Sequence, residues 1–319
     1  MSTLIRRLAA MLALLLSLAC AMAPMAWAES PVLVDRMADP EAPWPFAEDA
    51  ELLEVWFPQM IDCDAALIRC GGEDVLIDCA SKAYAKRLLT LLDGLGISAI
   101  RTIYNTHPHH DHLLGFDQVA AHVAVGELAV CFPEDENERM VEALQAAQAR
   151  GVPVTHYADG DILRVGGAEI TVFLRGDPEW SVNNRSAMMR LQFGQRVMLF
   201  TADMEKQALI RAVEDIDPAL LKADIMKYPH HGLTLLSDEF AAAVSPLLCV
   251  VTNNLRPSKT YYDLRLRKLA YTITSRGYTH LVTDGETWLA EIIPAEEMLA
   301  AQQAYLADHQ SVATWSPSK

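Results

Sequence analysis

The stretch TIYNTHPHHDHLLGF, residues 102–116, places four histidines and one aspartate within six positions at the end of an apolar, strand-like run. In the pattern HxHxDH, His107 and His109 lie two positions apart, and side chains two apart in an extended segment project to the same side. Asp111 and His112 then turn toward a neighbouring position. Imidazole and carboxylate groups are ligands of divalent transition metals. The stretch therefore predicts two adjacent metal sites supplied by one turn.

Two later strand ends carry the same residue types. Asp203 ends the apolar run RVMLFTAD, and the run ADIMKYP stops at His230, His231 and Gly232. Carboxylates and imidazoles at the ends of buried strands are costly unless they are paired or bound to metal. We interpret Asp203 as a carboxylate between two ions; a cap for the helix predicted at MEKQALIRAVED is the competing explanation.

The order of predicted elements indicates the fold class. Short strands with turn residues between them alternate with segments of helical periodicity, such as KAYAKRLLTLLDGLG (residues 82–96) and AEEMLAAQQAYLADH (residues 295–309). The segment YDLRLRKLAYTITSRG (residues 262–277) is predicted to form one helix. Strand-rich halves interleaved with helices favour two sheets with helices packed outside, an α/β fold with four layers in the order α/β/β/α.

The N-terminus is typical of an exported protein. Arg6 and Arg7 precede a long apolar run that ends in the triplet Ala-Trp-Ala, which predicts a signal peptide over residues 1–28. An uncleaved membrane anchor is the alternative, and Ser17 argues against lipid attachment at Cys20. We expect an extended arm over residues 29–50 and a single domain over residues 51–319. No other stretch is long and apolar enough to span a bilayer, so we expect an extracytoplasmic protein without a membrane span.

Charge and cysteine content limit the partners and the chemistry. The formal net charge is −16, and removal of the signal peptide would take away two arginines and no acidic residue. Such a surface repels polyanions at long range, which disfavours tight binding of duplex nucleic acid. The cysteines that would remain do not have zinc-binding spacing, and we interpret them as small core residues, with one disulfide left open: Cys63, Cys70, Cys79, Cys131 and Cys249.

Taken together, HxHxDH, the strand-terminal Asp203 and the HHG motif resemble the metallo-β-lactamase superfamily. Within it, the chain looks similar to the ComEC-type branch, the extracytoplasmic hydrolase module of competence proteins, in a stand-alone secreted form. The similarity extends over residues 51–293 and includes the hairpin LEVWFPQMIDCDAALIRCGGEDVLIDCAS, the segment NNRSAMMRLQFGQRVMLFTAD and the closing THLVTDGETWLAEI.

The resemblance implies roles for particular residues. The implied ligands are His107 and His109 for site one, Asp111 and His112 for site two, Asp203 as the bridge, and His231 as the last ligand with His230 as second choice. Asp78 matches an aspartate that supports the site from beneath. The candidate substrate-binding residues are Asn183, Asn184 and Ser186, which stand where many relatives have a glycine-histidine-threonine segment. The glycine usual before the bridging aspartate is Ala202.

The expected function is a metal-dependent hydrolase that uses a metal-bound hydroxide, with Asp111 or Asp203 accepting the proton of the water. Two divalent ions are expected, with Zn²⁺ as the default and Mn²⁺ as the alternative. The resemblance favours phosphodiester or related phosphoryl substrates, either small molecules or single-stranded polyanions. The competing functions are hydrolysis of a lactam, lactone or thioester, and an extracellular binding module with little catalysis.

Overall fold

Strands β2 (Leu53–Phe57), β3 (Ala66–Cys70) and β4 (Glu73–Ile77) pair in antiparallel order, and β3 and β4 form a hairpin. Gly71 and Gly72 both have positive φ in the turn between β3 and β4. The computed structural model describes residues 32–255 and 258–313, with side chains as far as residue 308. The predicted signal peptide lies outside the described residues. From Val32 onward the chain forms one compact unit.

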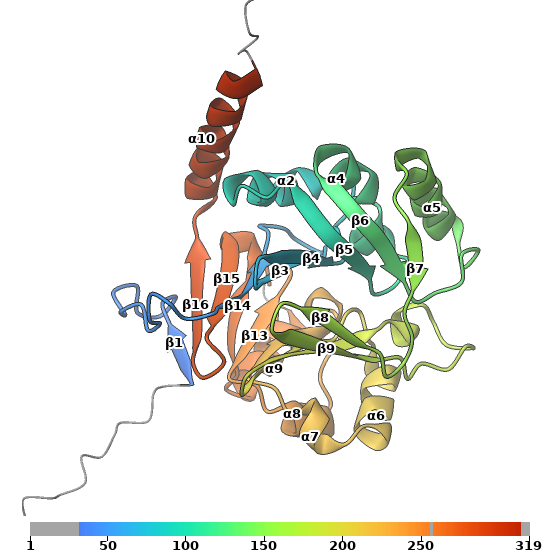
Figure 1. The fold of residues 1–319 in the computed structure, drawn as a ribbon. Helices are drawn as coiled ribbons and strands as arrows, with labels where there is room; N and C mark the ends of the chain where they lie inside the picture. Colours follow the sequence, from blue (N-terminus) through green and yellow to red (C-terminus); the bar gives the residue numbers. More distant parts are fainter. Residues whose placement is uncertain (1–31, 256–257, 314–319) are drawn as a thin grey trace, which may run out of the picture. The chain divides into compact units, whose positions relative to one another are not determined.

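The strands form two sheets (Figure 1). The first has nine strands in the order β1, β16, β15, β2, β3, β4, β5, β6, β7, completed by β1 (Leu33–Asp35), β5 (Ala99–Asn105), β6 (Ala124–Val130), β7 (Val154–His156), β15 (Tyr278–Thr283) and β16 (Trp288–Ile293). The second has seven strands in the order β14, β13, β12, β11, β10, β9, β8, formed by β8 (Ile162–Val165), β9 (Ala168–Phe173), β10 (Met188–Phe193), β11 (Arg196–Phe200), β12 (Ile225–Lys227), β13 (Leu248–Val251) and β14 (Ala270–Ile273).

Helices cover the outer faces of both sheets (Figure 1). The first sheet carries α2 (Ala85–Gly94), α4 (Phe116–His122) and α5 (Glu138–Arg150), with α10 (Ala295–Ala313) packed on α2. The second carries α6 (Lys206–Asp215), α7 (Pro218–Leu221), α8 (Asp238–Val244) and α9 (Lys259–Leu266). A third apolar cluster, with side chains from both sheets such as Val55 and Met198, fills the space between them. The predicted four-layer α/β/β/α fold is confirmed.

Three segments differ from the expectation. The predicted helix over residues 262–277 is wrong: α9 ends at Leu266, Lys268 takes a positive φ, and β14 then pairs in parallel with β13. The apolar residues of this segment fit the repeat of a helix as well as that of a strand. Pairing with the edge of the second sheet selects the strand. The expected arm contains β1, which pairs in parallel with β16. Strand β6 was not predicted. Among the described residues, no helix combines the length and apolar character needed to cross a bilayer.

Candidate metal centre

The candidate site lies where strands of both sheets end. In the first sheet β4 and β5 run in parallel and lead to Asp78 and to the turn of residues 106–112; in the second, β11 and β12 run in parallel and lead to Asp203 and to the short 3₁₀ helix η2 (Pro229–Gly232). Because the carboxyl ends of parallel strands meet at one edge, the topology brings these remote stretches together.

The carboxylate of Asp203 lies at the centre of the group. Its Oδ1 is 3.2 Å from His112 Nε2, and its Oδ2 is 3.3 Å from His231 Nε2. The side chain is 2% exposed. Glu205, not Asp203, occupies the cap position of α6, so the competing helix-cap explanation is wrong. Burial raises the pKa of Asp203, but His112 and His231 outweigh burial and hold it well below its usual range.

His107 and His109 form one side of the group. His107 Nε2 is 3.8 Å from Asp203 Oδ2 and 3.1 Å from His109 Nδ1. Burial lowers the pKa of both imidazoles, which keeps them in the neutral form that a metal requires. His230 also approaches the carboxylate, with its Nε2 3.7 Å from Asp203 Oδ2.

Asp111, His112 and His231 form the other side. His231 Nε2 lies 3.1 Å from Asp111 Oδ2, and His112 Nε2 lies 3.9 Å from the same oxygen. Burial by itself lowers the pKa of His112, but the carboxylates of Asp203 and Asp78 raise it to about 10. Burial likewise lowers the pKa of His231, while Asp203 and Asp64 raise it well above its usual value. These carboxylates favour positive charge at the position of the two imidazoles.

Two buried carboxylates support the histidines from beneath. Asp78 Oδ2 is 2.7 Å from His112 Nδ1, and Asp78 Oδ1 accepts the Thr106 backbone N–H at 2.8 Å. Asp64 Oδ1 lies 3.2 Å from His231 Nδ1, whose hydrogen bond is with Thr252 Oγ1 at 3.0 Å. Each pair turns the Nε2 atom of its histidine toward Asp203, an arrangement that orients metal-binding imidazoles in proteins. Asp64 was not predicted, although its position in the apolar segment MIDCDAALI offered a signal.

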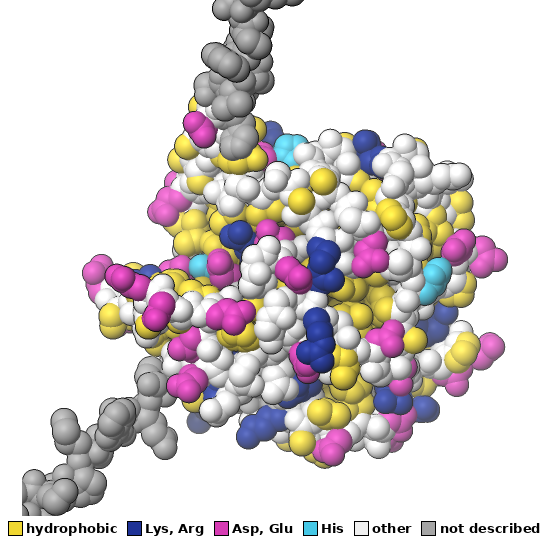
Figure 2. Space-filling view, in the orientation of Figure 1, with side chains coloured by type: hydrophobic (Ala, Val, Ile, Leu, Met, Phe, Trp, Pro, Cys, Tyr) yellow, Lys and Arg dark blue, Asp and Glu magenta, His cyan; other side chains and the backbone are white. Residues whose placement is uncertain are grey.

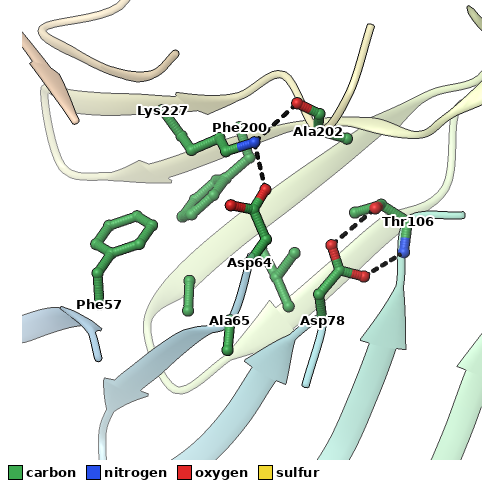
Figure 3. Close-up of a pocket in the computed structure, with 10 residues that line it drawn as sticks. Phe57, Asp64, Ala65, Asp78, Thr106, Phe200, Ala202 and Lys227 are labelled. Atoms are coloured by element: carbon green, nitrogen blue, oxygen red, sulfur yellow. Dashed lines mark hydrogen bonds and ion pairs between the residues drawn. The ribbon is translucent and has the colours of Figure 1, made fainter. Parts of the chain in front are cut away.

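Lys227 is the second residue that the sequence interpretation missed. Its ammonium forms an ion pair with Asp64 and donates to the Ala202 carbonyl at 2.8 Å (Figure 3). The same nitrogen lies 3.6 Å from Asp203 Oδ1. The side chain is 2% exposed. Burial alone lowers the pKa of Lys227, but Asp64 and Asp203 raise it. The sequence signal for this residue is a lysine inside the apolar run ADIMKYP, where a charged side chain is costly to bury without a partner.

The cavity in Figure 3 lies beneath the histidines and belongs to the supporting structure. It has a volume of about 10 Å³ and is lined by Lys227, Asp64, Asp78 and the rings of Phe57 and Phe200. A space of that size holds about one water molecule. It is therefore too small to admit a substrate.

Backbone strain accompanies the second-sheet residues. Ala202, His230 and His231 all have positive φ, at 44°, 50° and 50°. Residues other than glycine rarely adopt this region, and such strain collects at functional sites. The His230 N–H donates to the Ala202 carbonyl at 3.0 Å, which ties the two strained turns together.

The three candidate substrate-binding residues divide into two groups. Asn183 Nδ2 lies 3.5 Å from His230 Nε2, so this side chain reaches the cluster. The Asn184 amide accepts the Ala208 N–H, and the Ser186 hydroxyl donates to the Asn183 carbonyl. Asn184 and Ser186 lie under α6, where they build the turn instead of facing the histidines. Of the three residues, only Asn183 lies beside the histidines, where its Nδ2 also donates to Glu205 Oε1 at 3.1 Å. Substrate binding by these residues stays a prediction.

The side chains present fit divalent metal ions. The described residues contain two groups of possible ligands, and within each group the ligand atoms all lie within 4.8 Å of one another. One group is Asp64, His112, Asp203 and His231, and the other is His107, His109 and Asp203. Of the first set, Asp64 faces the Nδ1 side of His231 and pairs with Lys227, so we assign it to support. Among the described residues, His112 Nε2 and Asp203 Oδ1 are buried without a hydrogen-bond partner. Buried polar atoms are rarely left so, and a cation between them would satisfy both.

Comparison with known proteins gives the family of the chain. Among solved structures, the chain resembles the metallo-β-lactamase fold protein YhfI from Bacillus subtilis (15% identity, covering 70% of this chain and 96% of that one, TM-score 0.46). It also resembles a B3 metallo-β-lactamase with an active-site glutamic acid (18% identity, covering 64% of this chain and 87% of that one, TM-score 0.42). A third similar structure is a diphosphatase of the PhnP family (15% identity, covering 62% of this chain and 85% of that one, TM-score 0.40). The family model of the metallo-beta-lactamase superfamily matches residues 61–244, more than half of the chain. The chain belongs to the metallo-β-lactamase superfamily of metal-dependent hydrolases.

Proposed function

We propose that this chain is an extracytoplasmic hydrolase of phosphodiester or related phosphoryl substrates, of the ComEC-type branch and in stand-alone secreted form. The observation that carries the proposal is the convergence of histidines from both sheets on Asp203, where two buried ligand atoms, His112 Nε2 and Asp203 Oδ1, make no hydrogen bond. The proposed ligands are His107, His109, Asp111, His112, Asp203 and His231, with His230 as the alternative to His231.

The proposed cofactor is a pair of divalent ions, Zn²⁺ or Mn²⁺. When bound, such ions lower the pKa of a water molecule to about 7 and stabilise negative charge that develops on substrate oxygens. Asp78 and Asp64 hold the rings of His112 and His231 in place for binding. Asp111, whose side chain is 15% exposed, is the most accessible carboxylate of the group and our candidate for taking the proton of the water through Oδ2.

Two features favour phosphoryl substrates over lactams. Asn183 stands in the segment where lactam-cleaving relatives carry a histidine, and its amide faces His230. The resemblance of the sequence to the ComEC-type branch supports the same choice. The net charge of −16, with acidic side chains spread over the face drawn in Figure 2, favours small or single-stranded substrates over a duplex.

The test uses mature protein, residues 29–319, with and without His109→Ala. Bound metal is quantified, and hydrolysis of bis(p-nitrophenyl) phosphate, a chromogenic cephalosporin and an aryl lactone is measured. We expect metal-dependent cleavage of the phosphodiester, and a loss of at least a hundredfold in His109→Ala. His156→Ala, an exposed histidine on β7, is the matched control. Equal activity of the unmodified protein and His109→Ala would contradict the metal centre. Preferential cleavage of the cephalosporin or the lactone would contradict the substrate class. Metal binding without any hydrolysis would indicate a binding module.

Export is tested separately. Expression of the full chain with fractionation of the cells and N-terminal sequencing should give an extracytoplasmic protein that begins near Glu29. Retention of residues 1–28 on a membrane-bound product would contradict cleavage and support the anchor.

A further inference from the structure

The outward face of α9 carries large apolar side chains. The helix buries Thr260 and Leu264, and Tyr262 lies on the opposite side, one turn before Leu266. A helix on the surface of a globular domain ordinarily presents polar residues on the side away from the core. Among the described large apolar side chains, the three with the largest exposed fractions are Leu266 at 83%, Leu233 at 65% and Tyr262 at 62%. Two of these three lie on this one helix face.

Leu233, the third of them, belongs to a loop that runs along α9. The Thr260 hydroxyl, in the first turn of the helix, donates to the Gly232 carbonyl. Arg267, directly after the last turn, donates through Nη2 to the Leu236 carbonyl at 3.0 Å. The loop between these two carbonyls is therefore held along the length of the helix. The most exposed apolar side chains of the described chain thus lie on neighbouring segments.

Basic side chains border this apolar surface. Lys259 and Arg265 lie on either side of Tyr262 around the helix, and Lys268 follows the last turn. All three basic side chains are exposed, and none of them forms an ion pair with another residue that the structure describes. Their charges are therefore available to a partner.

The acidic side chains nearby lie toward α8. Asp263, the one acid of α9, accepts a hydrogen bond from Arg267 Nε at 3.0 Å, and Arg267 Nη1 pairs with Asp238 at the start of α8 at 2.8 Å. Residues 258–269 hold four basic residues and one acid, a net charge of +3 in a chain of net charge −16. The sum stays positive when Asp238 and Glu239 of α8 are added. This surface therefore complements an anionic partner, which the rest of the protein repels.

The residue types favour a lipid membrane over a nucleic acid as that partner. Exposed leucine and tyrosine side chains leave water when they insert among lipid headgroups, and basic residues at their border then reach the anionic headgroups. Nucleic-acid bases stack on aromatic rings, which accounts for an exposed tyrosine but not for exposed leucines. The apolar groups are also held by a formed helix, so binding does not have to order them.

We propose that this surface docks the protein on an anionic lipid membrane. It comprises the outward face of α9 and the loop beside it: Leu233, Lys259, Tyr262, Arg265, Leu266 and Lys268. The loop begins at Gly232, which directly follows the proposed ligand His231, so docking brings the metal centre close to the lipid surface. The proposal goes beyond the hydrolytic function and does not depend on it.

Co-sedimentation with vesicles tests the proposal. The protein is the mature form, residues 29–319, which contains the whole compact unit without the apolar run of the predicted signal peptide. Vesicles of equal parts phosphatidylglycerol and phosphatidylcholine are compared with vesicles of phosphatidylcholine alone. We expect binding to the anionic vesicles, and about tenfold weaker partitioning of Tyr262→Ser/Leu266→Ser. Arg265→Gln/Lys268→Gln should lose about tenfold on anionic vesicles and little on neutral ones.

Matched controls change equally exposed side chains elsewhere. They are Ile162→Ser on β8, whose side chain is 55% exposed, and Lys86→Gln/Arg87→Gln on α2. No binding to anionic vesicles, or losses no larger than in these controls, overturns the proposal. Binding of a fluorescent oligothymidylate that depends on the same residues, without binding to vesicles, identifies a nucleic-acid surface and also overturns it. Because the vesicle measurement uses no substrate, its failure leaves the proposed hydrolysis unaffected.

Discussion

At the scale of single residues, each of two buried histidines lies between two carboxylates. His112 contacts Asp78 through Nδ1 and Asp203 through Nε2, and His231 contacts Asp64 and Asp203 in the same way. The carboxylates attract positive charge at the imidazoles, which either protons or metal ions can supply. Protonation and metal binding therefore compete at these atoms.

The pH dependence of stability should differ between metal-free and metal-loaded protein. The folded-state pKa of His112, about 10, exceeds the ordinary value of about 6.5, so the proton stabilises the metal-free fold below pH 6.5 and is lost toward pH 10. Asp203 stays charged throughout this window because its pKa is lowered. Urea unfolding with chelator should show a falling free energy from pH 6.5 to 10, and with metal a flatter profile. The same slope in both would contradict proton–metal competition.

Lys227 should be essential to the fold unless Asp64 changes with it. Lys227→Met leaves the buried Asp64 carboxylate without its ion pair, at a cost of about 3–5 kcal/mol. The double variant Asp64→Asn/Lys227→Met should recover most of this loss. Lys206→Met, at the exposed start of α6, is the control. Urea denaturation measures all three; a double variant as unstable as the single one would show that the pair is not the cause.

Ala202→Gly should stabilise the protein. Ala202 has a φ of 44°, which glycine adopts without strain, so the gain in the free energy of unfolding should be about 1 kcal/mol. Ala208→Gly, inside α6, should lose about 1 kcal/mol because its backbone is helical. Urea denaturation of both variants is the measurement. A loss of stability in Ala202→Gly would contradict the strain.

At the scale of elements, local pattern predicted most strands and helices but failed for three strands that are defined by pairing with other strands. Strands β6, β1 and β14 gain their stability from neighbours remote in sequence. The site shows the same limit. The HxHxDH turn is local and could be predicted, as could the strand-terminal Asp203. Asp64 and Lys227 lie in apolar runs, and their meeting depends on the docking of the two sheets.

Strand β1 offers a test of this tertiary contribution. Val34 pairs with Leu289 on β16 and packs in a small apolar cluster with Phe46 and Val282. Val34→Ser should cost about 1 kcal/mol by loss of burial. Val32→Ser, at a side chain 39% exposed, should change stability by less than about 0.5 kcal/mol. Urea denaturation compares the two, and equal effects would favour a free arm over a strand.

At the scale of the whole molecule, the described cysteines form no disulfide: Cys63, Cys70, Cys79, Cys131 and Cys249. Four are buried, and burial raises the pKa of the half-buried Cys131 to about 12. In the mature protein, residues 29–319, which lacks Cys20, we expect five thiols to react with a thiol reagent after unfolding in guanidinium, and at most one to react rapidly in the native protein. Three reactive thiols after unfolding without reductant would instead reveal a disulfide.

The even contribution of both sheets to the centre has a consequence for assembly. His107 and His112 come from one sheet, and Asp203 and His231 from the other, so the complete proposed ligand set exists only after the two halves have docked. We therefore expect tight ion binding to be a late step of folding, because it awaits contacts between distant parts of the chain. In refolding, chelator should leave the early collapse unchanged and remove only the last phase.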